Sequence, residues 1–162
     1  PLYFERQSQM RCGMHALNNA LGHLGQPLFD ILDMERACDT VIEESLYADD
    51  HGVVSDPKFR EDHMKDNGWY SDDVMSMALR RKGNAYELQL GLQLRHNRNI
   101  LHDDQIVGAI TNKDQEHWVA LKKMEDKIWL LDSAAVPRIL SSEDYYALLA
   151  RYPHTYKIKA LN

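Results

Sequence analysis

The chain has 162 residues, a length typical of one domain, and 44% of them are hydrophobic, which is enough to bury a core without disulfide or metal support. Its 25 acidic residues outnumber the 19 basic ones, and the resulting net charge of −6 argues against nucleic-acid binding. No run approaches the ~20 apolar residues that span a bilayer, and the first residues lack the apolar segment of a signal peptide. We therefore expect one domain over residues 1–162, monomeric and without membrane association.

The first two thirds of the chain show mainly helical patterns. Residues 13–24 carry an apolar stripe at helical spacing. Helix-compatible residues continue over 28–47, and a shorter helix is expected over 59–65, so that the two form charged arms outside the core. Ser71 has the chemistry of an N-cap, because two aspartates follow it in the first turn, and Gly83 is expected at the end of that helix. The stripe of the first helix consists of Ala16, Leu17, Ala20, Leu21 and Leu24.

The last third shows mainly strand patterns. A short strand is expected over residues 85–90, and a loop without clear periodicity follows. Ser141 begins a capping arrangement for a helix that Pro153 ends. Helices on one side and an antiparallel sheet on the other predict the α+β class. The remaining expected strands cover residues 106–110, 117–122, 128–131 and 155–161.

The two cysteines, Cys12 and Cys38, are too few for a disulfide framework and have no spacing for a zinc site. One bridge between them is arithmetically possible, but reduced thiols in a cytoplasmic or nuclear protein are the simpler expectation. Cys12 stands almost at the start of the first predicted helix. Unpaired backbone N–H groups and the positive end of the helix dipole favour the thiolate there, and the thiolate is the nucleophilic form of cysteine.

A catalytic cysteine needs a base, and His117 is the best candidate because it begins a predicted strand that can hold its ring at a fixed angle. If residues 123–126 form a four-residue hairpin loop, Lys122 pairs with Lys127 and His117 lies directly opposite Asp132. A carboxylate there would fix the tautomer of the imidazole and stabilise its cation. The histidines expected in solvent are His23, His51, His63, His96, His102 and His154.

Acyl transfer also needs a hydrogen-bond donor for the developing oxyanion. Gln7 stands five residues before Cys12 and Gln9 stands three before it, and composition alone does not choose between them. His15 follows Cys12 by three residues, on the same side of the helix. We interpret His15 as making a polar contact near the helix start rather than as the base.

The chain resembles the Josephin family of deubiquitinating cysteine proteases in several motifs that occur in the expected order. A glutamine precedes the cysteine by five residues, and a Cys-x-x-His-x-Leu-Asn-Asn string begins at Cys12. Glu116-His117-Trp118 is similar to the family's His-Trp strand, and residues 129–133, Trp-Leu-Leu-Asp-Ser, are similar to its second strand. The segment from Gly68 to Leu79 is also similar, so the resemblance extends over nearly the whole chain.

The resemblance implies a papain-like fold, with an N-terminal catalytic helix and helical hairpin arms packed on a small antiparallel sheet. It implies Cys12 as nucleophile, His117 as general base and acid, Asp132 as its orienting partner, and Gln7 rather than Gln9 as the oxyanion donor. Some members have asparagine in place of this aspartate. No metal or organic cofactor is implied, and the implied partner is ubiquitin or a ubiquitin-conjugated protein, in the chain's own cell or in a host cell.

The expected function is therefore hydrolysis of ubiquitin isopeptide or peptide bonds through a thioester. Two alternatives stay open. A transglutaminase or glutamine deamidase would use the same three side chains. A catalytically silent module that only binds ubiquitin is the other, although such a module has no need for the complete set of Gln7, Cys12, His117 and Asp132.

Overall fold

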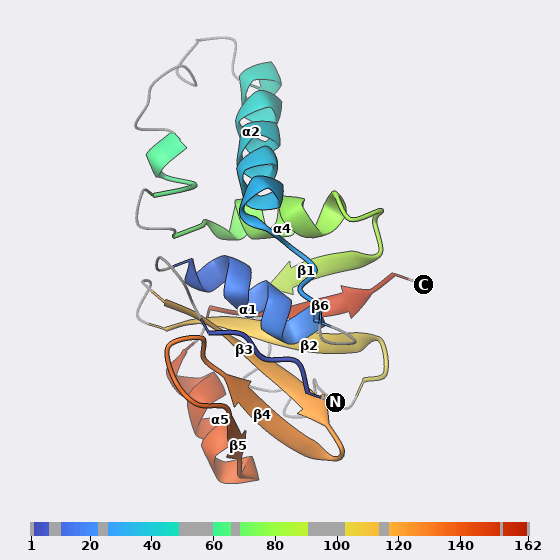
Figure 1. Cartoon of the computed structure of the whole chain (residues 1–162), viewed down its shortest axis with the longest axis vertical. Coiled ribbons are helices and arrows are strands. Elements are labelled where there is room, and N and C mark those ends of the chain that lie inside the picture. Colours follow the sequence, from blue (N-terminus) through green and yellow to red (C-terminus); the bar gives the residue numbers. More distant parts are fainter. Residues whose placement is uncertain are drawn as a thin grey trace.

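A computed structural model describes residues 2–6, 11–22, 26–48, 60–65, 69–90, 103–113, 117–152 and 154–161. In these ranges the chain forms four helices and a six-stranded sheet (Figure 1). The helices are α1 (Cys12–Leu21), α2 (Ile31–Ala48), α4 (Asp72–Arg80) and α5 (Ser142–Arg151). The strands are β1 (Tyr86–Leu90), β2 (Ile106–Lys113), β3 (His117–Met124), β4 (Lys127–Leu131), β5 (Arg138–Leu140) and β6 (Thr155–Ala160).

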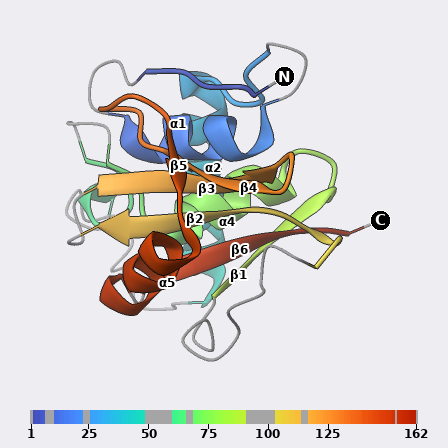
Figure 2. The ribbon, with the colours of Figure 1, turned by 90° about the horizontal axis from the view of Figure 1, so that it is seen from below.

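The sheet has the strand order β1-β6-β2-β3-β4-β5, and every neighbouring pair is antiparallel. One of its two central strands, β3, is buried on both faces. Trp118 and Ala120 belong to the core cluster that includes α1, whereas Val119 and Leu121 belong to the cluster that includes α5. Figure 2 shows α1 and α5 on opposite sides of the sheet. The predicted α+β class is thus confirmed, and the sheet carries helices on both faces.

The long helix α2 projects away from the sheet and packs on α4 (Figure 1). Its contact face is apolar and comprises Met34, Ala37, Cys38 and Val41. No helix within the described ranges is both long enough and apolar enough to cross a membrane.

The prediction of a helix over 59–65 is wrong for most of its length, since only Arg60 and Glu61 are helical and residue 59 lies outside the described part. The backbone beyond them pairs across a turn instead. Lys65 N–H donates to the carbonyl of Trp69, and Ser71 N–H donates to the carbonyl of His63. These bonds compete with helix formation for the same backbone groups.

His63 is a second correction, because this ring is half-buried rather than solvated. Its Nδ1 lies 2.8 Å from Ser71 Oγ. Ser71 is also the N-cap of α4, as predicted, since its Oγ accepts from Val74 N–H. His154 is exposed as expected, and the loop expected over residues 91–104 is described only from residue 103 onward. The other four histidines expected in solvent lie outside the described residues.

Helix α5 carries a buried hydroxyl whose removal should not cost stability. Tyr145 is 2% exposed, and its hydroxyl has no hydrogen-bond partner among the described residues. An unsatisfied buried polar group costs about 1–3 kcal/mol. We expect Tyr145→Phe to raise the free energy of unfolding by about 1 kcal/mol, measured by urea denaturation.

Tyr156 provides the matched control for this change. Its hydroxyl donates to Asp72 Oδ2 at 3.0 Å, so Tyr156→Phe should lower the free energy of unfolding by about 1 kcal/mol. Equal losses in both variants would contradict the expectation, because they would mean that the Tyr145 hydroxyl is stabilised in the folded chain.

Candidate active site

Cys12 is the first residue of α1, and its thiol is buried against the start of β3. The side chain is 3% exposed, and the backbone N–H of Trp118 donates to Sγ at 3.4 Å. No acidic residue stands in the first turn of α1, and no side chain caps the helix. The sulfur therefore sits where backbone donors and the helix dipole favour negative charge.

The junction of α1 with β3 is packed so tightly that it fixes the position of Cys12. A Cβ added at Gly13 would lie 3.2 Å from Met75 Sδ and from Tyr70 Cδ2, and 3.4 Å from Trp118 Cδ1. The Trp118 indole also donates to the carbonyl of Tyr70 at 3.0 Å. The packing roles of Gly13 and Tyr70 were not predicted from the sequence. The glycine next to the candidate nucleophile was the only feature of the sequence that pointed to this close packing.

His117 and Asp132 are joined by a hydrogen bond of 2.6 Å from Nε2 to Oδ1. The predicted register between these two strands is nevertheless wrong by two residues. Met124 pairs with Lys127, so the hairpin loop is only the two residues between them, and both have positive φ. A shift of two keeps side chains on the same face, so the pair is diagonal and still within reach.

Asp132 is held from two sides. Its Oδ1 accepts from the backbone N–H of Ala134 at 2.9 Å as well as from His117. Burial opposes ionisation of this carboxyl, but the hydrogen bonds from His117 and Ala134 outweigh burial and hold its pKa below the usual range. Asp132 is therefore ionised at neutral pH and oriented toward the imidazole.

The His117 ring is strongly biased toward its protonated form. Its pKa is raised from 6.5 to about 9, mainly by the hydrogen bond to Asp132 and next by hydrogen bonding to the Cys12 thiol, with burial opposing both. Because Nε2 is occupied by Asp132, Nδ1 is the nitrogen left for the sulfur. The structure thus brings Cys12, His117 and Asp132 into one interacting set.

Of the other residues that the sequence singled out, some lie outside the described part of the chain and others make contacts away from the Cys12–His117–Asp132 set. Gln7 and its competitor Gln9 lie outside the described residues. His15 Nδ1 lies 3.0 Å from Glu5 Oε2, in line with a polar contact near the helix start. Cys38 is buried in α2, and both cysteines are free thiols. Among the described residues, no group of three His, Cys, Asp or Glu side chains is arranged to hold a metal ion.

Asn18 and Asn19 fix the first helix to its surroundings. Asn18 Oδ1 accepts from the N–H groups of Leu28 and Phe29, and its Nδ2 donates to the Phe29 carbonyl. Both asparagines are fully buried. Their side chains satisfy backbone groups of the segments on either side of α1, so the helix that carries Cys12 is anchored in the fold.

Comparison with known proteins identifies the family to which the chain belongs. The family model for Josephin matches residues 7–158 of the 162-residue chain. The chain belongs to the Josephin family. Josephin proteins are in general cysteine-protease-like deubiquitinases, and the four helices and six-stranded antiparallel sheet of the described residues agree with the papain-like Josephin fold. No curated protein matches the chain significantly.

Proposed function

We propose that this Josephin chain is a thiol isopeptidase that releases ubiquitin from conjugates, with Cys12, His117 and Asp132 as its catalytic residues. The observation that carries the proposal is the meeting of a buried helix-start thiol with a His117 ring whose Nε2 lies 2.6 Å from Asp132. The family match supports ubiquitin as the partner, because Josephin domains in general bind it.

The reaction follows from the charge states of these groups. The Cys12 thiolate attacks the carbonyl carbon at the ubiquitin C-terminus, and the proton on His117 passes to the departing lysine amine. The product is a thioester on Cys12 and a neutral imidazole. His117 then takes a proton from water, which attacks the thioester and releases the ubiquitin carboxylate and the thiol. Gln7 and a backbone N–H at Cys12 are proposed as donors to the oxyanion formed in each step.

A ubiquitin C-terminal electrophile probe tests partner, nucleophile and reaction class together. We expect covalent labelling of the purified chain, with mass mapping of the adduct to Cys12. Labelling of another residue, or no labelling under conditions where the chain binds ubiquitin, would contradict the proposal. Ammonia release from glutamine substrates without probe labelling would indicate the deamidase or transglutaminase alternative.

The raised pKa of His117 predicts the alkaline side of the pH profile. The resting enzyme needs a protonated ring, so kcat/KM for a ubiquitin C-terminal amide reporter should fall as the pH rises through about 9. Protonated His117 also stabilises the fold below its ordinary pKa of 6.5, and this contribution is lost as the pH rises through about 9.

Asp132→Asn provides the control for this profile. The amide still accepts a hydrogen bond but carries no negative charge, so the alkaline midpoint should move to lower pH. A midpoint that stays in place in this variant would show that another group controls the alkaline limb.

A further inference from the structure

The segment between β4 and β5 exposes an unbroken run of apolar residues directly after Asp132. Residues 134–137 read Ala-Ala-Val-Pro; the first three are exposed, and the proline is half-buried. Val136 is 69% exposed, more than any other large hydrophobic residue of the described chain, and Ile139 in β5 is 44% exposed. We call residues 134–137 and Ile139 the apolar rim. A run of exposed apolar residues of this length is unfavourable in solvent unless it has a function.

The apolar rim is fixed to the same carboxylate that orients the imidazole. Ala134 N–H donates to Asp132 Oδ1 at 2.9 Å, and Ala135 N–H donates to the Asp132 carbonyl at 2.9 Å. The same Oδ1 is bonded to His117 Nε2 at 2.6 Å. The rim therefore begins one hydrogen-bonded group away from the imidazole, and the tight turn and the proline that follows restrict its backbone.

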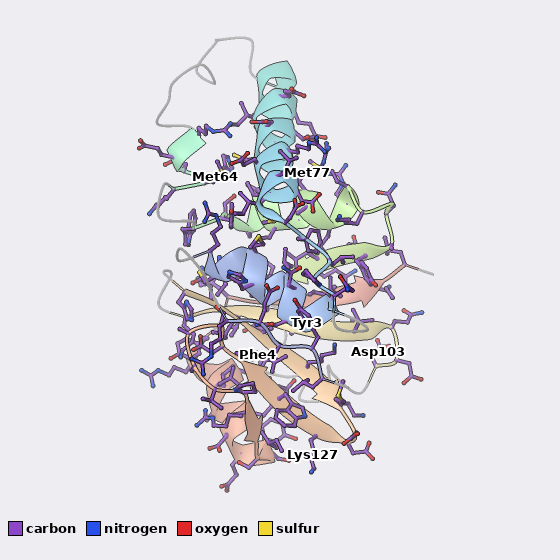
Figure 3. The ribbon with its side chains drawn as sticks, viewed as in Figure 1. Tyr3, Phe4, Met64, Met77, Asp103 and Lys127 are labelled. Atoms are coloured by element: carbon purple, nitrogen blue, oxygen red, sulfur yellow. The ribbon has the colours of Figure 1, made fainter. Side chains whose placement is uncertain are left out.

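The apolar rim lies at the end of the sheet where α1 starts. β4 begins at Lys127, which Figure 3 shows at the far tip of the β3–β4 hairpin, and the strand runs back from there toward α1. The segment between β4 and β5 then lies near the first turn of α1 in both ribbon views (Figures 1 and 2). Cys12 is the first residue of that helix, so the rim borders the candidate active site.

The proposed reaction places the departing chain on the imidazole side of this site. The acyl carbon bonds to Cys12, whereas the departing lysine amine takes its proton from His117 and must lie within hydrogen-bond distance of that ring. The four methylene groups of lysine span about 6 Å, so the polypeptide that carries the lysine passes close to the imidazole. Val136 is four residues from Asp132, at most about 14 Å along the chain, and the turn shortens this distance. The rim is thus within reach of residues that flank the modified lysine.

We propose that the apolar rim binds the protein from which ubiquitin is released, through apolar side chains that flank its modified lysine. Ile139 pairs with Trp129 of β4, which packs against the core cluster of α1, so Ile139 lies on the face of the sheet that carries Cys12. Val136 and Ile139 supply the contact area. The inference rests on the proposed function and adds a preference to it, because conjugates with apolar residues beside the lysine should be cleaved faster than conjugates with polar ones.

Two ubiquitin conjugates and one reporter test the inference. In each conjugate, ubiquitin is linked to the lysine of a short peptide, and the lysine is flanked by leucines in one and by serines in the other. The reporter is a ubiquitin C-terminal amide whose leaving group is a fluorophore and no polypeptide. Wild-type kcat/KM should be about ten-fold higher for the leucine conjugate than for the serine conjugate, since burial of one aliphatic side chain contributes about that factor.

Val136→Asp should remove this preference. We expect kcat/KM for the leucine conjugate to fall about ten-fold, chiefly through KM, with the serine conjugate and the reporter unchanged. Ile139→Thr keeps a β-branched side chain in β5 and should lower the leucine conjugate about three-fold, so it carries the test if Val136→Asp fails to fold.

Leu161→Asp is the matched control. Leu161 is 45% exposed, and it follows β6 near the C-terminus, at the opposite end of the sheet from the apolar rim (Figure 1). Its backbone N–H, which donates to the Ala85 carbonyl, is retained. All three substrates should be cleaved at the wild-type rate by this variant.

The outcomes separate this inference from the proposed function. Equal wild-type rates for the two conjugates, or a Val136→Asp variant that keeps the preference, would overturn the role of the rim and leave the isopeptidase intact. An equal loss with the reporter would assign the rim to ubiquitin itself, and a wild-type dimer that Val136→Asp dissociates in size-exclusion chromatography would assign it to a second copy of the chain; each would also overturn the inference. A folded wild-type chain that neither reacts with the probe nor turns over the reporter would overturn the proposed function as well.

Discussion

Replacing Cys12 by serine should abolish turnover and leave the fold in place. The hydroxyl of serine is not ionised at neutral pH, so the attack on the carbonyl is lost and kcat for the ubiquitin reporter should fall by about 10⁵-fold or more. Serine still offers an acceptor to the Trp118 N–H that contacts Cys12 Sγ at 3.4 Å. The melting temperature should therefore change by only a few degrees, and labelling by the electrophilic probe should disappear.

Cys38→Ala is the matched control for this variant. Cys38 is also a buried, free thiol, but it lies in α2 where that helix packs on α4. Its removal should cost about 1 kcal/mol of stability through a small cavity and leave kcat unchanged. Residual turnover in Cys12→Ser at more than a thousandth of the wild-type rate would contradict the assignment of the nucleophile.

Replacing His117 by alanine should lower kcat almost as much as replacing Cys12 by serine. In the proposed mechanism the ring both stabilises the thiolate as its counter-ion and delivers the proton to the departing amine, so one substitution removes two contributions. We expect kcat to fall by about 10⁴-fold with KM within a few-fold of wild type, measured by reporter turnover under saturating conditions.

Two further variants test whether the loss of kcat in His117→Ala is specific to this ring. Asp132→Asn should cost less than His117→Ala, because an asparagine carbonyl can still accept from Nε2 and orient the ring. His154→Ala should match wild type, since this histidine is exposed and its backbone carbonyl, which accepts from Asn112 N–H, is retained. If Asp132→Asn were slower than His117→Ala, the carboxylate would have a role beyond orienting the ring.

The sequence predicts the helices of this fold well because each has a local signature. The apolar stripe of α1 and the serine N-caps of α4 and α5 depend on contacts within a few residues. β5 was missed because Arg138–Leu140 is too short to show periodicity, and it exists only through pairing with β4. The helix expected over 59–65 fails for a similar reason, since pairing with residues 69–71 decides the backbone there.

The hairpin between β3 and β4 shows why the geometry of the site was harder to predict from the sequence than the identity of its residues. Glu125 and Asp126 both adopt the left-handed conformation, with φ of 54° and 61°, which aspartate tolerates but glutamate rarely adopts. A four-residue loop was therefore the more natural expectation. Cys12, His117 and Asp132 could be selected from chemistry, whereas the contacts of Glu5 with His15 and Asn19 depend on packing that no local pattern records.

The long separation between the two halves of the site has a consequence for synthesis on the ribosome. Cys12 and the Trp118 N–H that contacts it are 106 positions apart, and β6, the last strand among the described residues, lies between β1 and β2 in the sheet. The sulfur thus emerges from the exit tunnel long before its imidazole does. A growing chain therefore carries a cysteine without its imidazole until β3 has been made, and the proposed isopeptidase activity is expected only after β6 has joined the sheet.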